Sequence, residues 1–120
     1  MAKHVLSIGN CGYDHGNLAK ALQKQFNVEL DAAATAAEAM EAVAGKTYDL
    51  IVVNRLFDLN GDSGIELIKK LKPTVKSPMM LISNYPEAQE EAVAAGAVKG
   101  FGKKVVGKPG LVEVVAEYLG

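Results

Sequence analysis

Short apolar runs and segments of helical spacing alternate five times along this chain, and this alternation constrains the fold more than any other feature. The runs that predict strands are 4–8, 28–32, 50–53, 79–82 and 97–101. After each run, apolar residues recur every three or four positions, which indicates a helix with one buried face. Right-handed crossovers between parallel strands place helices on both faces of a sheet. We therefore predict an α/β fold with three layers, a doubly wound five-stranded parallel sheet of the (βα)5 type.

Local signals mark where most of the helices begin. Thr35–Glu38 and Ser63–Glu66 are capping boxes, in which a hydroxyl and a carboxylate can accept hydrogen bonds from free backbone N–H groups. Pro86 and Pro109 suit the first position of a helix, where the missing N–H costs nothing. These four signals place the second to fifth helices directly after the second to fifth strands.

The loop 9–16 precedes the first helix and contains three glycines. Glycines allow backbone N–H groups to approach a phosphate, but this loop matches neither the dinucleotide-binding pattern nor the lysine-bearing phosphate loop. We interpret the glycines as shaping the loop and Asp14 as the cap of the first helix. Cys11 lies near the helix start, where a thiolate would be stabilised, so both a reactive and a structural role are open.

Length, charge and cysteine content narrow the class of protein. The chain has 120 residues, enough for one core, so we interpret residues 1–120 as a single domain. Its formal net charge of -1 gives no electrostatic argument for binding nucleic acid or an anionic membrane. No apolar run is long enough to span a bilayer, and the first residues lack the apolar core of a signal peptide. With one cysteine and no internal disulfide, we expect a cytoplasmic protein.

The central apolar run ends on a polar residue. Leu50–Val53 contains four consecutive apolar residues, as expected for a strand that is buried on both faces. Asn54 follows at its carboxyl end. Open α/β sheets place their working groups at that edge, so Asn54 marks the expected functional site.

Several motifs together resemble the receiver domain of bacterial two-component response regulators, over essentially the whole chain. The motifs are Tyr48-Asp-Leu-Ile-Val-Val before Asn54, Asn60-Gly-Asp-Ser-Gly-Ile-Glu-Leu after it, then Ser77-Pro-Met-Met-Leu-Ile-Ser and Ala95-Gly-Ala. The resemblance implies a flavodoxin-like fold with strand order 2-1-3-4-5. It also implies a role in phosphorelay signal transduction.

The residues that carry the chemistry of that family are replaced here. In receiver domains an acidic pair after the first strand holds magnesium, and an aspartate after the third strand takes a phosphoryl group from a histidine kinase. Gly9 and Asn10 stand at the positions of the pair, and Asn54 stands at that of the aspartate. An amide is a poor nucleophile, and Mg²⁺ favours carboxylates. Asp58 and Asp62 are offset from the strand edge, so we expect neither to replace the aspartate.

These replacements predict a pseudo-receiver. We expect weak or absent magnesium binding, no other cofactor, no phosphorylation at the usual site and no enzymatic activity. Two further positions contact the phosphoryl group in the family, and Ser83 matches the first of them. The second is a lysine, which is Lys104 if one residue is inserted before Phe101 and Lys103 without a gap. We prefer Lys104, because it keeps Phe101 at the aromatic switch position.

We predict a signalling module that binds partner proteins, including possible homodimers, through the face near Pro86, Phe101 and Leu111. Val112 and the valine pair 105–106 either leave apolar surface on this face or complete the core.

An alternative function is a non-covalent sensor of an anion or a small phosphorylated ligand. Asn10, Asn54 and Ser83 are neutral, so Lys104 would give a pocket between them a positive charge. In the competing interpretation Lys104 bends into solvent or pairs with Asp58.

Overall fold

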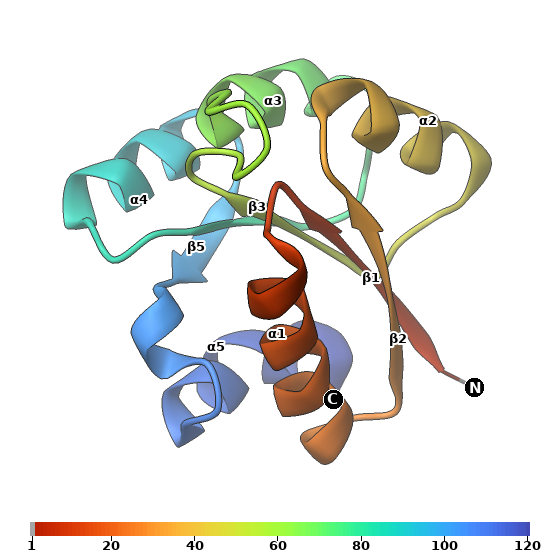
Figure 1. Ribbon diagram of the computed structural model, residues 1–120, viewed down its shortest axis with the longest axis vertical. Helices are drawn as coiled ribbons and strands as arrows, with labels where there is room; N and C mark the ends of the chain where they lie inside the picture. The colour runs from red at the N-terminus through yellow and green to blue at the C-terminus, as the bar shows by residue number, and fades with distance from the viewer. Residues whose placement is uncertain (1) are drawn as a thin grey trace.

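The computed structural model describes residues 2–120 as one five-stranded parallel sheet between two layers of helices (Figure 1). The strand order is β2-β1-β3-β4-β5, and neighbouring strands are parallel throughout. The predicted fold class and strand order are confirmed.

Strands and helices alternate along the chain as the apolar pattern predicts. The strands are β1 (Lys3–Ile8), β2 (Val28–Ala33), β3 (Leu50–Asn54), β4 (Met79–Ile82) and β5 (Val98–Phe101). The helices are α1 (Gly12–Gln25), α2 (Ala36–Gly45), α3 (Gly64–Leu71), α4 (Pro86–Ala94) and α5 (Pro109–Leu119), and a short 3-10 helix, η1 (Lys103–Val105), follows β5.

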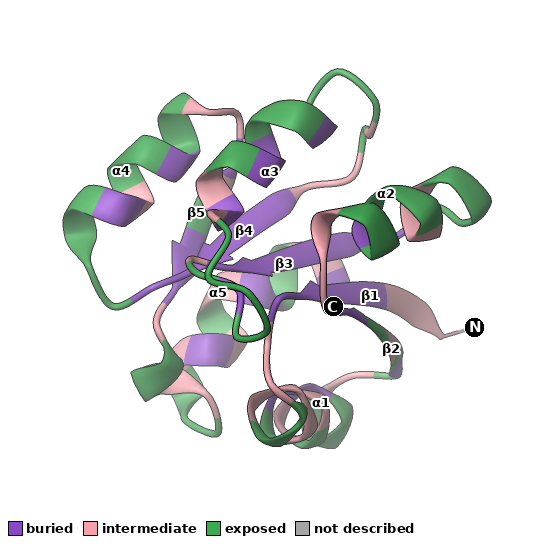
Figure 2. Ribbon diagram, turned by 45° about the horizontal axis from the view of Figure 1, so that its top comes forward, coloured by how far each residue is buried: buried purple, intermediate pink, exposed green. Residues whose placement is uncertain are grey.

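The helices cover the two faces of the sheet unequally. Helices α2, α3 and α4 lie on one face and α1 and α5 on the other (Figure 1). Each helix is buried mainly on the side that faces the sheet (Figure 2), which is the pattern expected of an amphipathic helix. Two apolar clusters result, one on each face, and side chains of alternating strand residues contribute to both.

Strand β3 lies at the centre of the sheet, and all five of its residues are buried. It pairs with β1 on one side and with β4 on the other. Burying a Val, Leu or Ile side chain contributes roughly 1.5–3 kcal/mol, so this strand is a large part of the core. Its last residue, Asn54, is thereby held in a fixed place at the sheet edge.

The two capping boxes form to different extents. The Thr35 hydroxyl accepts from the backbone N–H of Glu38 at 3.1 Å, and the Glu38 carboxylate accepts from the N–H of Ala34 at 3.1 Å. The Ser63 hydroxyl accepts from the N–H of Glu66 at 3.2 Å. The Glu66 carboxylate instead accepts from the Lys69 ammonium at 3.1 Å, so the second box is only half complete.

Helix α1 begins earlier than predicted. It starts at Gly12, so the second half of the expected loop 9–16 is helical. Cys11 is the N-cap residue, and its sulfur accepts from the backbone N–H of Asp14 at 3.4 Å. The predicted capping role of Asp14 is therefore wrong. Glycine disfavours helix by about 1 kcal/mol per residue, and the burial of Leu18 and Leu22 against the sheet outweighs this cost.

Strand β5 contains an irregularity close to the site. Met80 pairs with Val98 and Ile82 pairs with Phe101, so β5 has one residue more than β4 between the two pairs. A bulge of this kind shifts the residues that follow it along the chain.

Among the described residues, no helix is both long and apolar enough to cross a membrane.

Candidate functional site

The carboxyl ends of the central strands meet at one edge of the sheet. Gly9 and Asn10 follow β1, Asn54 ends β3, and Ser83 follows β4. Asn54 and Ser83 are each only 8% exposed, and they are two of the three buried polar residues in the described chain. Buried polar groups require hydrogen-bond partners, so the partners of Asn54 decide what this site can do.

The Asn54 side chain acts as a hydrogen-bond donor. Its amide nitrogen Nδ2 donates to the carbonyl oxygen of Gly9 at 3.2 Å and to that of Leu56 at 2.8 Å. One amide thus joins the end of β1 to the loop that leads into α3. An ionised aspartate has only acceptor oxygens, so it could not make either bond. Asn54 is fitted to a structural task that a carboxylate cannot perform.

Gly9 cannot be exchanged for an acidic residue without rearrangement. Its φ of 77° lies in the left-handed region, and a Cβ atom at this position would overlap the buried ring of Phe57. The carbonyl oxygen of Gly9 also accepts from the backbone N–H of Asp58 at 2.9 Å. Where receiver domains carry one of the acidic residues, this chain therefore packs an aromatic ring.

The remaining groups at the edge are similarly engaged. The Asn10 amide donates to the Ser7 hydroxyl at 2.8 Å, and the Ser83 hydroxyl accepts from the backbone N–H of Tyr85 at 3.1 Å. At the start of α3, a Cβ on Gly64 would overlap the carbonyl oxygen of Asn54, so helix and strand approach closely there.

A magnesium ion does not fit this set of groups. Mg²⁺ requires oxygen ligands, usually with one or two carboxylates. The oxygens of Gly9 and Leu56 already accept hydrogen bonds from Asn54, and Gly9 offers no side chain. Within residues 2–120, no three His, Cys, Asp or Glu side chains come together in a way that could hold a metal ion.

Of the two candidate lysines, Lys103 lies at the cavity beside Asn54. Lys103 lines a cavity of about 230 Å³ together with Asn54 and Ser83. Lys104 lines a different cavity, between α4 and β5, and its backbone N–H lies 3.5 Å from Oδ1 of Asn84. The two lysines separate because η1 begins at Lys103 and turns successive side chains in different directions.

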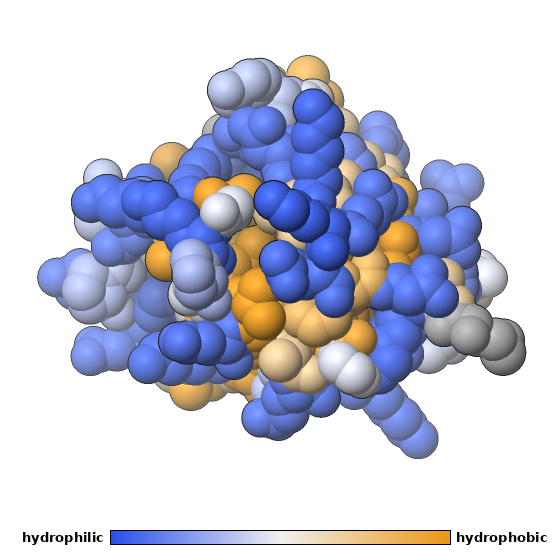
Figure 3. All heavy atoms as spheres, turned by 90° about the horizontal axis from the view of Figure 1, so that it is seen from below, coloured by the Kyte–Doolittle hydropathy of each residue, from blue (hydrophilic) through white to orange (hydrophobic). Residues whose placement is uncertain are grey.

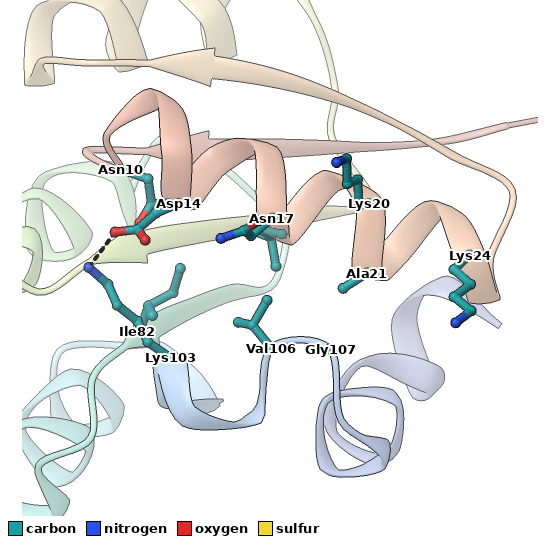
Figure 4. A pocket seen from close by; sticks show the side chains of 11 residues that line it. Asn10, Asp14, Asn17, Lys20, Ala21, Lys24, Ile82, Lys103, Val106 and Gly107 are labelled. Carbon is teal, nitrogen blue, oxygen red and sulfur yellow. Dashed lines mark hydrogen bonds and ion pairs between the residues drawn. The ribbon is translucent and has the colours of Figure 1, made fainter.

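Lys103 forms an ion pair that the sequence did not suggest. Its ammonium donates to the carboxylate of Asp14 at 2.7 Å (Figure 4). The hydrogen bond from Lys103 is the main reason why the pKa of Asp14 lies below its ordinary value, although partial burial opposes the shift. Lys103 is therefore paired with a carboxylate and does not face neutral groups alone. Asp58 and Asp62 are both exposed, and neither makes an ion pair with a described residue.

The predicted switch residues lie together at the ends of β4 and β5. The backbone N–H of Ser83 donates to the carbonyl oxygen of Phe101 at 2.9 Å. The Phe101 side chain is 5% exposed and belongs to the cluster under α1 and α5. Tyr85 is 57% exposed, and the Arg55 guanidinium lies 5.0 Å from the centre of its ring.

Solved structures of response regulators share this fold. NtrX from Brucella abortus superposes with a TM-score of 0.85 at 21% sequence identity, covering 99% of this chain and 27% of NtrX. The receiver domain of NtrX alone gives a TM-score of 0.83 at 20% identity, covering 96% of this chain and 97% of that domain. A CheY-like receiver domain protein from Methanospirillum hungatei JF-1 gives 0.74 at 23% identity, covering 98% and 93%.

No protein-family model matches the chain, and no curated protein is similar to it in sequence. At these identities the solved structures establish a shared fold. The chain spans about a quarter of the length of full NtrX and nearly the whole of an isolated receiver domain.

Replacing Asn54 by aspartate tests its role as a donor. We expect Asn54→Asp to lower the free energy of unfolding by about 1–3 kcal/mol, because two carbonyl oxygens lose their donor and face a carboxylate. This environment raises the pKa of the introduced carboxyl, so the loss is larger at pH 7 than at pH 4. Urea unfolding at both pH values measures it.

Asn84→Asp is the matched control for this substitution. Asn84 is exposed, and its Oδ1 acts as an acceptor, which a carboxylate oxygen can replace. Its unfolding midpoint should stay close to that of the natural chain. Equal midpoints for Asn54→Asp and Asn84→Asp would contradict the donor role.

Removing the charge of Lys103 tests the ion pair. We expect Lys103→Met to raise the pKa of Asp14 toward its ordinary value of 3.8, and Lys104→Met to leave it unchanged. Because the pKa of Asp14 is lowered in the folded state, the pair stabilises the fold above the ordinary pKa. This contribution disappears as the pH falls through the lowered value. Carboxyl carbon NMR of Asp14 during an acid titration checks both variants.

Proposed function

We propose that this chain is a receiver-like signalling module that is not phosphorylated at Asn54 and acts through contacts with other proteins. The observation that carries the proposal is the pair of hydrogen bonds from the Asn54 amide to Gly9 and Leu56. The side chain at the position of the phosphoacceptor is uncharged, and its amide nitrogen already donates to two backbone carbonyl oxygens. Asn54 supplies neither a carboxylate nucleophile nor an anionic metal ligand at that point of the edge.

The other groups at the edge support the same proposal. In the receiver domains that this chain resembles, the lysine and the serine contact the phosphoryl group. Here Lys103 is already paired with Asp14, and the Ser83 hydroxyl already accepts from the Tyr85 backbone. Phe101 already lies in the core. The conformation of these positions is therefore set by the folded chain itself, without a modification.

The surface proposed for partner binding is the α4–β5 face, which we define by the residues around the cavity between α4 and β5. That cavity has a volume of about 740 Å³. Tyr85 and Val93 on its rim are 57% and 48% exposed, which is unusual for large apolar side chains. Val105 is half-buried at the cavity wall, whereas Leu111 is 1% exposed and belongs to the core.

Gln89 holds this face rigidly against the sheet. Its amide nitrogen donates to the carbonyl oxygens of Leu81 at 2.9 Å and Ser83 at 3.1 Å, with a longer contact to Phe101 at 3.4 Å. Its oxygen accepts from the backbone N–H of Gly100 at 3.1 Å. These bonds satisfy backbone groups that the irregular β4–β5 pairing leaves free, and they lock α4 to the strand edge. A fixed face of this kind suits a partner that recognises one conformation.

Acetyl phosphate tests whether the chain accepts a phosphoryl group. We expect incubation with acetyl phosphate and Mg²⁺ to leave the intact mass unchanged, because the edge lacks a carboxylate nucleophile and a magnesium site. A receiver domain that retains its aspartate, treated in parallel, should gain the mass of one phosphoryl group. A stable gain of that mass by this chain would refute the proposal.

The α4–β5 face can be tested through self-association. If the chain forms a homodimer through this face, Val93→Glu should dissociate the dimer. Burying an ionised carboxylate in an apolar contact raises the free energy of the dimer. Met40→Glu is the matched control, since Met40 is 41% exposed on α2 at a distant surface. Light scattering over a range of protein concentrations measures both. A dimer that survives Val93→Glu and dissociates with Met40→Glu would place the contact elsewhere.

A further inference from the structure

A second cavity lies between α1 and the turn that follows β5, and neither the strand edge nor the α4–β5 face accounts for it. Its volume is about 380 Å³ (Figure 4). It shares Lys103 and Ile82 with the cavity at Asn54 and also includes Asn10 from the strand edge, but most of its wall comes from α1 and the turn 106–107. A volume of this order is typical of sites for small molecules.

The cavity is open because small residues face each other across it. Ala21 on α1 lies opposite Val106, and Gly107 carries no side chain. A neighbouring cavity of about 500 Å³ between α1 and α5 shares Ala21, Lys24 and Gly107. The two cavities therefore form one groove, which we call the α1 groove. Figure 3 views the molecule from this side and shows apolar surface between hydrophilic side chains.

The floor of the α1 groove is apolar and belongs to the core. Leu18 and Ile82 line it and are 2% and 4% exposed, and half-buried Val106 forms the opposite wall. These side chains are held in place by the sheet beneath them. An apolar group placed here would be withdrawn from water, which favours its binding.

The rim of the groove carries excess positive charge. Lys20, Lys24 and Lys103 line the first cavity beside one acid, Asp14, and the second cavity adds Lys108 and Glu113. Asp14 is already paired with Lys103, whereas Lys20 and Lys24 make no ion pair with any residue that the structure describes. The exposed Asn17 amide adds a further hydrogen-bond donor on the same side of α1. The field at this rim favours an anion.

We propose that the α1 groove binds a small organic anion with an apolar body. The carboxylate or phosphate head group would contact Lys24, and the apolar body would lie on Ala21, Ile82 and Val106. The apolar floor and the cationic rim each attract one part of such a molecule. The inference is independent of the proposed partner binding, because the groove lies on the opposite side of the sheet from α4.

The binding test uses the aromatic sulfonate dye ANS, which has an apolar body and one negative charge. We expect ANS fluorescence to rise on binding to the wild-type chain, and the amide NMR signals of Ala21 and Val106 to shift. The neutral analogue N-phenylnaphthylamine should bind more weakly, because it lacks the charge that the lysines attract. Inorganic phosphate should not displace ANS, because it lacks the apolar body. Shifts confined to Tyr85 and Val93 would overturn the proposal.

Two pairs of variants locate the site. Ala21→Leu fills the groove and should weaken ANS binding by at least about tenfold, whereas Ala37→Leu adds the same atoms at an exposed position on α2 and should not. Lys24→Gln should weaken binding by about two- to fivefold, and Lys70→Gln on α3 should leave it unchanged.

Circular dichroism confirms that each variant folds. Unchanged affinity in folded Ala21→Leu would refute the proposal, and the NMR mapping on the wild-type chain decides independently of any variant.

Discussion

The hydrogen bonds of the Asn54 amide are the constraint on which the rest of this strand edge depends. A buried N–H group that loses its hydrogen-bond partner destabilises the fold by about 1–3 kcal/mol. Moving the Gly9 or Leu56 carbonyl away from the Asn54 amide would therefore be unfavourable. The loop after β3 is closed by further backbone bonds, including those from Phe57 to Asp62 and from Gly64 to Arg55. Phe57 is thereby held over Gly9 and fills the space that a carboxylate would need.

A switch requires two arrangements of similar free energy, each stabilised by different contacts. At this edge, three polar side chains already make contacts within the folded chain. Asn54 bonds to the backbone, Ser83 accepts from the backbone of Tyr85, and Lys103 is neutralised by Asp14. The same set of contacts that removes the chemistry also stabilises one arrangement of the edge. Gln89 links this edge to α4 through its hydrogen bonds to the carbonyl oxygens of Leu81 and Ser83.

The sequence could predict the fold because the fold depends on local periodicity. The apolar run of β3, the prolines that open α4 and α5, and the Thr35 cap are signals within a few residues, and the structure contains them all. Strand order came only through the resemblance. The Lys103–Asp14 pair joins residues 89 positions apart, and no local sequence pattern predicts a contact over that separation. The choice between the two lysines depended on where η1 begins after an irregular strand.

Lys103 is the charged side chain that lines both the cavity at the strand edge and the α1 groove. It lines the cavity at Asn54 and the cavity beside α1, and its ion pair with Asp14 closes the end of the groove. A ligand in the groove that binds more tightly while this pair is intact must, by thermodynamic linkage, stabilise the pair to the same extent. An occupant of the groove that stabilises the Lys103–Asp14 pair would thereby act on the strand edge.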